Sequence, residues 1–270
     1  MRINTNLNAM IATNQMSKNT ALAGASMEKL STGLRITKAG DDAAGLAVSE
    51  KMRAQIRGME QAERNVQDGI SMVQTAEGAL EEAGNIAQRM RELGVQAGND
   101  TLSAEDRTKV KEELKQLQDE MKNISEETKF NGKQLLNTAG TFTIQAGANS
   151  ETRTVSTANL ASIANDLSLT STNISSTSDA QSFVKKVDVA LESINAARSA
   201  LGAMQNRLEY TANNLTTSTE NLTAAESRIR DVDVAKEMVT LSKLNILNQA
   251  SQAMVSQAKQ QPESVSQLLR

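Results

Sequence analysis

Two clusters of charged residues are the places where this 270-residue chain carries side chains suited to chemistry. Asp41 and Asp42 adjoin each other, and neighbouring carboxylates are common ligands of a divalent cation. The same pair also suits a helix starting near Ala43, as an N-cap and a first-turn acid, and we favour this interpretation. Charged residues at 228–233 form the second cluster, which we interpret as a solvated or intersubunit charge group. Neither cluster predicts a catalytic or metal-binding site.

The residue types that are missing exclude most classes of enzyme. The chain holds no Cys, no His and no Trp, with 3 Phe and 1 Tyr. It therefore lacks thiolate nucleophiles, Ser-His pairs and the usual zinc ligands. A formal net charge of −3 and the scarcity of aromatic side chains argue against nucleic-acid binding. We expect no enzymatic activity, no metal, no cofactor and no nucleic-acid partner.

Length and hydropathy set the broad class of protein. At ~100–200 residues per domain, the chain is long enough for one or two domains with a sizeable core. No apolar run reaches the ~18–20 residues of a membrane span, so no membrane partner is expected. The start of the chain lacks the apolar segment of a secretory signal, so we also expect no cleaved signal peptide.

Long helices are the elements that must position these residues. The one proline stands at position 262, and apolar residues recur at 4-3-4-3 spacing between positions 52 and 87, which indicates helices packed as a coiled coil. A first helix is expected to end before Gly33. A last helix is expected from about Val234 to Ala258, with Pro262 ending it. The clearest repeat places an apolar residue at every seventh position: Val187, Ile194, Leu201, Leu208, Leu215, Leu222 and Ile229.

A short β segment interrupts the helical pattern in the middle of the chain. Residues 141–145 and 152–156 alternate polar and apolar side chains around a turn, which predicts a β-hairpin. Ser103 is a good N-cap for the helix before it, and Ser178 with Gln181 matches a capping box for the helix after it. The Ser-, Thr- and Asn-rich stretch at 156–182 is expected to be loop. The predicted fold is all-α dominated: an elongated antiparallel helical bundle or coiled coil with a small β-hairpin in the middle of the chain.

Long and specific motifs stand at both ends of the chain. They include MRINTN at the start, LSTGLRITKAGDDAAGLAVSE at 30–50, ENLTAAESRIRDVD at 220–233 and the closing QLLR. By these motifs, which cover roughly residues 1–137 and 184–270, the chain resembles bacterial flagellin in a short form without the extra outer domains. The resemblance implies a structural subunit that self-assembles into the helical flagellar filament for motility.

The resemblance also implies a division into three parts. Residues 1–42 would form an N-terminal helix that pairs with a C-terminal helix at 233–270 in the filament core. Residues 43–232 would form a rod domain, with the hairpin at about 141–156. The protein would be extracellular, in the bacterial flagellum, exported by the flagellar secretion apparatus, with an export chaperone and a filament cap as partners. Apolar residues of the terminal helices are the expected polymerisation contacts: Ile3, Leu7, Ile11, Leu22, Met238, Leu241, Ile246, Met254, Leu268 and Leu269.

A contact with an animal receptor is implied in the same way. The family presents one face of its rod to the innate-immune Toll-like flagellin receptor. The matching residues here are Gln88, Arg89, Glu92, Leu93, Leu117 and Glu120. Two alternatives stay open: a hook–filament junction protein, which is a flagellin relative, and a signalling coiled coil such as the cytoplasmic hairpin of a chemotaxis receptor. A protease-bearing flagellin is rejected because the chain has no His for a zinc site.

Overall fold

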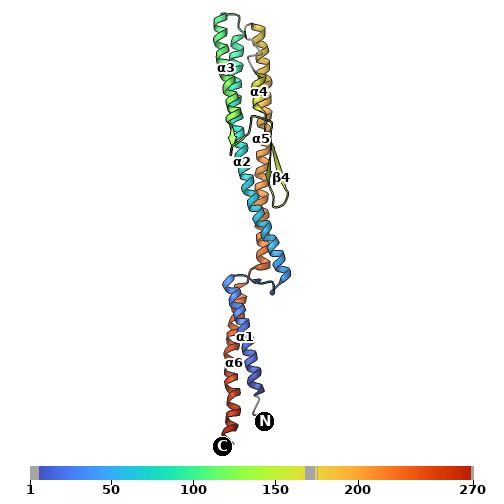
Figure 1. The fold of residues 1–270 in the computed structure, drawn as a ribbon, viewed down its shortest axis with the longest axis vertical. Coiled ribbons are helices and arrows are strands. Elements are labelled where there is room, and N and C mark those ends of the chain that lie inside the picture. The colour runs from blue at the N-terminus through green and yellow to red at the C-terminus, as the bar shows by residue number, and fades with distance from the viewer. Residues whose placement is uncertain (1–5, 168–173, 175, 269–270) are drawn as a thin grey trace. The chain divides into compact units, whose positions relative to one another are not determined.

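The structure, a computed structural model, describes residues 6–167, 174 and 176–268. It confirms a helix-dominated fold with a small central hairpin (Figure 1). The chain divides into two compact units, residues 1–54 with 221–270 and residues 55–220. The helices are α1 (Leu7–Thr32), α2 (Ala43–Ala97), α3 (Ala104–Glu127), α4 (Leu160–Asp166), α5 (Thr177–Arg230) and α6 (Val234–Leu268). The strands are β1 (Lys129–Phe130), β2 (Lys133–Gln134), β3 (Thr141–Gln145) and β4 (Thr152–Ser156).

The first unit pairs the two ends of the chain. α1 and α6 run antiparallel, and the side-chain amide of Asn6 donates to the carbonyl of Ala258 over 2.6 Å. α1 ends before Gly33, whose φ of 72° is a left-handed conformation that glycine adopts without the steric cost of a Cβ. The backbone N–H of Val232 donates to the carbonyl of Gly33 over 3.0 Å. This bond ties the loop after α1 to the segment that leads into α6.

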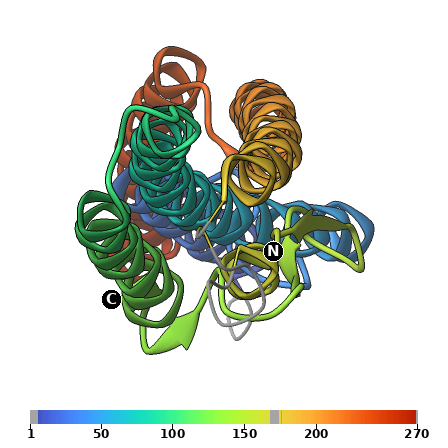
Figure 2. The ribbon, with the colours of Figure 1, turned by 90° about the horizontal axis from the view of Figure 1, so that it is seen from above.

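The second unit is built on α2 and α5, which run antiparallel in a continuous register. The hydroxyl of Thr216 donates to the carboxylate of Glu63 over 3.2 Å. Further along, the guanidinium of Arg91 lies 2.6 Å from the carboxylate of Asp188. Seen end-on, α3 and α5 flank α2 (Figure 2). α2 is therefore the central helix of this unit.

Two rows of apolar side chains form the core of the second unit. Because positions seven apart face the same side of a helix, the rows meet along the antiparallel pair and exclude water. The buried members of the predicted α5 repeat are Val187, Ile194, Leu201, Leu208 and Leu215, and Leu222 and Ile229 are half-buried. The buried members of the α2 row are Met59, Val66, Val73, Leu80 and Ala87.

The predicted β-hairpin is confirmed. β3 and β4 pair antiparallel over the expected residues, 141–145 with 152–156, and the inward side chain of Ile144 is buried. A second hairpin, β1–β2, is missed by the pattern analysis. Its two-residue turn is formed by Asn131 and Gly132, with φ values of 50° and 78°. An Asn-Gly pair is the sequence signal for such a turn, because both residues tolerate positive φ.

The segment at 156–182, expected to be loop, contains a short helix and the start of α5. The side-chain oxygen of Asn159 caps α4 by accepting from the backbone N–H of Ser162 over 2.9 Å. Leu160 and Ala164 of α4 are buried, so the helix is held by packing. α4 is shorter than the window over which helical periodicity can be seen, which explains why it is missed. Residues 168–173 and 175 lie outside the described residues.

The start of α5 and the end of α6 correct two further expectations. The Ser176 hydroxyl accepts from the backbone N–H of Asp179 over 3.2 Å and donates to its carboxylate over 2.8 Å. This arrangement caps α5, so the expected capping box of Ser178 with Gln181 is wrong by two residues. α6 continues past Pro262, so the expected stop there is also wrong. A proline deprives the helix of one backbone donor, and here the helix extends beyond that defect.

Candidate assembly and recognition surfaces

Asp42 caps α2, and Asp41 orders the loop in front of it. The Asp42 carboxylate accepts from the backbone N–H of Gly45 over 2.9 Å, so the predicted N-cap is confirmed. Both Asp41 and Asp42 precede α2, whose first turn holds no acidic residue, so the expected first-turn acid is wrong. Asp41 accepts from the backbone N–H groups of Lys38 and Thr37, each over 3.1 Å, and these bonds lower the pKa of its carboxyl below the ordinary 3.8. Among the described residues, no group of three or more potential ligands is arranged to hold a metal ion.

The second charged cluster belongs to an ion-pair network inside the first unit. The guanidinium of Arg230, which is largely buried, donates to the carboxylate of Glu50 over 2.5 Å. Arg53 lies 3.0 Å from Glu226, whose side chain is 12% exposed. The two pairs join the start of α2 to the end of α5. The cluster is therefore intramolecular at Arg230, which corrects the interpretation as a solvated or intersubunit group, and Asp233 caps α6.

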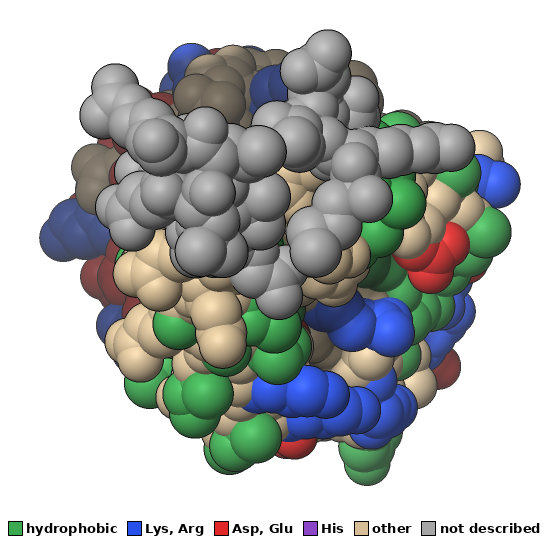
Figure 3. Space-filling view, turned by 90° about the horizontal axis from the view of Figure 1, so that it is seen from below, with side chains coloured by type: hydrophobic (Ala, Val, Ile, Leu, Met, Phe, Trp, Pro, Cys, Tyr) green, Lys and Arg blue, Asp and Glu red, His purple; other side chains and the backbone are tan. Residues whose placement is uncertain are grey.

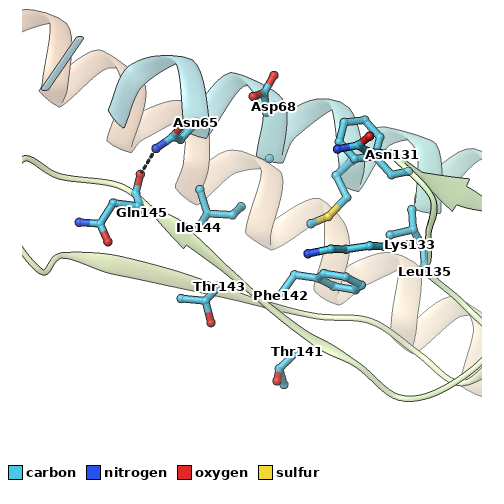
Figure 4. Close-up of a pocket in the computed structure, with 13 residues that line it drawn as sticks. Asn65, Asp68, Asn131, Lys133, Leu135, Thr141, Phe142, Thr143, Ile144 and Gln145 are labelled. Carbon is cyan, nitrogen blue, oxygen red and sulfur yellow. Dashed lines mark hydrogen bonds between the residues drawn. The ribbon is translucent and has the colours of Figure 1, made fainter. Parts of the chain in front are cut away.

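A groove of about 480 Å³ opens between α2, the β1–β2 turn and β3 (Figure 4). The side-chain amide of Asn65 donates to the carbonyl of Gln145 across it, over 3.3 Å. A Cβ added at Gly69 would lie 2.3 Å from Cδ1 of Ile144, so the hairpin packs directly against α2 at this point. The groove follows from this close contact, and we assign it no ligand.

The α1–α6 pair buries polar as well as apolar side chains and leaves many apolar ones exposed. Asn19, Ser26 and Ser251 are at most 5% exposed, and Leu244 is the large apolar residue buried with them. A typical helix pair buries its apolar stripe, because that burial drives the association. Here a larger set of apolar side chains is exposed, and the apolar residues of the seam are mostly half-buried: Met16, Ala23, Leu30, Leu241 and Val255. Seen from the end where the chain termini lie, hydrophobic side chains reach the surface (Figure 3). Exposed apolar side chains gathered on one helix pair are candidates for a contact with another molecule.

Most of the predicted polymerisation residues lie on this exposed surface. Other exposed apolar residues of α1 and α6 are not in the predicted set, including Val239, which is 71% exposed. On α6 two pairs of exposed apolar residues are seven positions apart, Val239 with Ile246 and Leu247 with Met254. Leu241 is half-buried, Leu268 is the last residue of α6, and Ile3 and Leu269 lie outside the described residues. We define the terminal apolar surface by its exposed members: Leu7, Met10, Ile11, Leu22, Met27, Val234, Met238, Val239, Ile246, Leu247 and Met254.

The residues expected to meet the receptor are divided between surface and core. Leu93 is 2% exposed and lies in the core, so it is not part of an exposed contact surface. Arg89 donates to the carboxylates of Glu113 over 2.9 Å and Glu92 over 3.1 Å, which raise the pKa of its guanidinium and fix its direction. Leu117 is half-buried, and the exposed members are Gln88, Arg89, Glu92 and Glu120.

Comparison with known proteins decides the family. The family model for the bacterial flagellin N-terminal helical region matches residues 3–141, and that for the C-terminal helical region matches residues 184–269. The chain belongs to the bacterial flagellin family. It is 53% identical to a flagellin of Halalkalibacterium halodurans over 272 residues and 49% identical to a flagellin of Bacillus subtilis over 308 residues, with full coverage of both chains in each case.

The crystal structure of Bacillus cereus flagellin agrees with this assignment. It matches with 34% identity and a TM-score of 0.52, over 60% of this chain and 94% of that one. Flagellins are structural proteins, and this flagellin is a subunit of the extracellular flagellar filament. Family membership rules out the signalling coiled coil. None of its described helices is both long and apolar enough to cross a membrane.

Proposed function

We propose that this flagellin polymerises through the terminal apolar surface, with α1 and α6 forming the filament core and residues 43–232 the surrounding rod. The observation that supports this is the set of apolar side chains that the α1–α6 pair leaves exposed outside its mixed polar and apolar seam. Fully burying a Val, Leu, Ile or Met side chain contributes about 1.5–3 kcal/mol. In the isolated chain the residues of the terminal apolar surface are exposed, so most of this free energy is not gained. A second copy offers the matching apolar face. Repetition in a helical lattice that does not close gives a filament.

The buried polar residues of α1 and α6 fit the same proposal. Asn19, Ser26 and Ser251 gain little from burial, so they weaken a seam whose apolar residues, apart from Leu244, are only half-buried. A weak pair with an apolar exterior is stabilised mainly by its neighbours. Folding of the terminal helices is thereby coupled to assembly.

The test compares one substitution at two exposed valines. Val239 is 71% exposed on α6 and Val189 is 62% exposed on α5 of the second unit. Val239→Thr keeps the shape and adds a hydroxyl, whose burial costs about 1–3 kcal/mol, so the critical concentration for polymerisation rises about 5- to 150-fold. Val189→Thr is the matched control and shifts it by less than about twofold. Equal effects of the two substitutions on sedimentable polymer would contradict the proposal.

The same surface is the proposed contact for the export chaperone and the filament cap. Both must bind the chain before its neighbours do, when the apolar side chains of α1 and α6 are still uncovered. We infer further that the chain leaves the cell through the flagellar secretion apparatus. It has a structural role and no catalytic activity.

A second proposed function is recognition by the Toll-like flagellin receptor. The supporting observation is Arg89, which stands half-exposed between two carboxylates, with Gln88 and Glu92 exposed beside it on α2. A pre-oriented guanidinium loses little conformational entropy when it binds. Leu117 and Glu120 of α3 extend this face.

The receptor proposal is tested with two arginines of the same helix. Arg89→Ala is expected to weaken a receptor-reporter response by about tenfold or more, the effect of an important interface residue. Arg91 is the matched control because it is similarly exposed but pairs with Asp188 on α5. Arg91→Ala is expected to leave the response within about twofold of the parent. A response unchanged by Arg89→Ala would refute this role.

A further inference from the structure

The methionines of the chain divide between the two units by exposure. Four of the five described methionines on α1 and α6 belong to the terminal apolar surface, whereas those on α2 and α3 of the second unit lie in the core. The exposed ones are Met10 (51%), Met27 (58%), Met238 (51%) and Met254 (54%). The buried ones are Met59, Met72, Met90 and Met121, and the half-buried ones are Met16, Met52 and Met204. Exposed thioethers therefore coincide with the surface that we assign to polymerisation.

We propose that Met10, Met27, Met238 and Met254 are oxidation sites through which a hydroperoxide controls the assembly of the free subunit. In the reaction the thioether sulfur attacks one oxygen of hydrogen peroxide. The S–O bond forms as the O–O bond breaks, sulfur loses two electrons, and the departing hydroxide takes up the proton of the attacked oxygen to become water. The product is methionine sulfoxide, which carries a polar oxygen where the side chain was apolar.

The effect on assembly rests on the proposed function. A sulfoxide oxygen buried between copies needs a hydrogen-bond donor, and the neighbouring side chains of the terminal apolar surface are Leu, Ile, Val and Met. An unsatisfied polar group opposes burial, so oxidised subunits polymerise only at a critical concentration about tenfold higher or more. Copies already in the filament cover one another's thioethers. The free subunit is therefore sensitive to peroxide and the filament is resistant.

The first measurement maps the oxidation. The full-length subunit and the polymerised filament are treated separately with hydrogen peroxide, and the added oxygen is located by peptide mass spectrometry. In the subunit, the four exposed methionines are expected to oxidise several-fold faster than Met59, Met72, Met90 and Met121. In the filament, oxidation of the four slows several-fold. Equal rates at both sets, or equal rates at the four in subunit and filament, would overturn the proposal.

The second measurement links oxidation to assembly. Peroxide-treated parent subunit is expected to lose polymerisation and to regain it after treatment with methionine sulfoxide reductases and a thiol reductant. The variant Met10→Leu, Met27→Leu, Met238→Leu, Met254→Leu keeps the apolar surface and should polymerise after the same treatment. The matched variant with Leu at the four buried positions should stay sensitive. If the four-site surface variant loses polymerisation as the parent does, the proposal is wrong.

The Val239→Thr substitution separates failure of the proposed polymerisation surface from failure of the oxidation proposal. If it does not affect polymerisation, the proposed function fails at the terminal apolar surface. If it does, while peroxide has no effect on the parent, the function stands and the oxidation control alone is refuted.

Discussion

The close contact between the hairpin and α2 leads to a quantitative prediction about two glycines of one helix. Gly69 and Gly78 both lie inside α2, and each costs helix stability by about 1 kcal/mol relative to Ala. A Cβ at Gly78 would meet nothing within 4 Å. A Cβ at Gly69 would lie 2.3 Å from Cδ1 and 3.3 Å from Cγ1 of Ile144. The same substitution therefore tests packing at one site and helix propensity at the other.

The expected magnitudes follow from these distances. Gly78→Ala stabilises the chain by up to about 1 kcal/mol. At Gly69 the same gain is opposed by an overpacked contact, which costs about 1–3 kcal/mol because the buried Ile144 must leave its rotamer. Gly69→Ala is therefore less stable than Gly78→Ala by about 1–3 kcal/mol. Urea unfolding followed by far-ultraviolet circular dichroism measures this difference.

A double substitution identifies the cause. Ile144→Val removes Cδ1, the atom nearest to the new methyl group, so Gly69→Ala should cost less in the Ile144→Val background than in the parent. The difference between the two backgrounds is the interaction energy of the cycle. If Gly69→Ala stabilises the chain as much as Gly78→Ala, the hairpin does not pack on α2 at this point and the reasoning is refuted.

Three other perturbations test the ends of helices and the chain termini. Hydrogen bonds from the hydroxyl and the backbone N–H of Ser103 lower the pKa of the Asp106 carboxyl. The stability that this carboxylate contributes is therefore complete above pH 3.8 and is lost as the pH falls through its folded-state pKa. Asp106→Asn should flatten the acid side of a curve of stability against pH, and an unchanged curve would contradict the role of Asp106. Arg230→Met should destabilise the first unit by about 1.5–3 kcal/mol in thermal unfolding, since Glu50 loses a charged donor, whereas exposed Arg57→Met should change little. A chain without its first 35 or so residues should remain soluble without forming sedimentable polymer, and polymer from this chain would contradict the role of α1.

Local periodicity accounts for what the sequence predicts well. The seven-residue repeat from Val187 onwards and the alternation at 141–156 each specify the buried face of one element. These predictions therefore do not depend on which other parts of the chain pack against that element. The turn at Asn131 and Gly132 has an equally local signal, the Asn-Gly pair itself. The burial of Leu93 also has a local signal. It lies three residues after Met90 and four before Ala97, a spacing that places all three on the buried face of α2.

The remaining features depend on which helices meet. Asn19, Ser26 and Ser251 look like solvated residues until α1 and α6 are paired, and only the pairing shows that the apolar residues face outward. Arg230 and Glu50 are 180 positions apart, so no sequence pattern predicts their ion pair. α4 is held by packing and is too short to show a period.

A side-chain-resolution structure of the polymer formed by the full-length chain tests the central claim most directly. Leu7, Ile11, Val239 and Ile246, which are exposed in the single chain, are expected to be buried between α1 and α6 of neighbouring copies. A filament in which these side chains remain exposed to solvent, with the contacts between copies made by residues 55–220 alone, would contradict it.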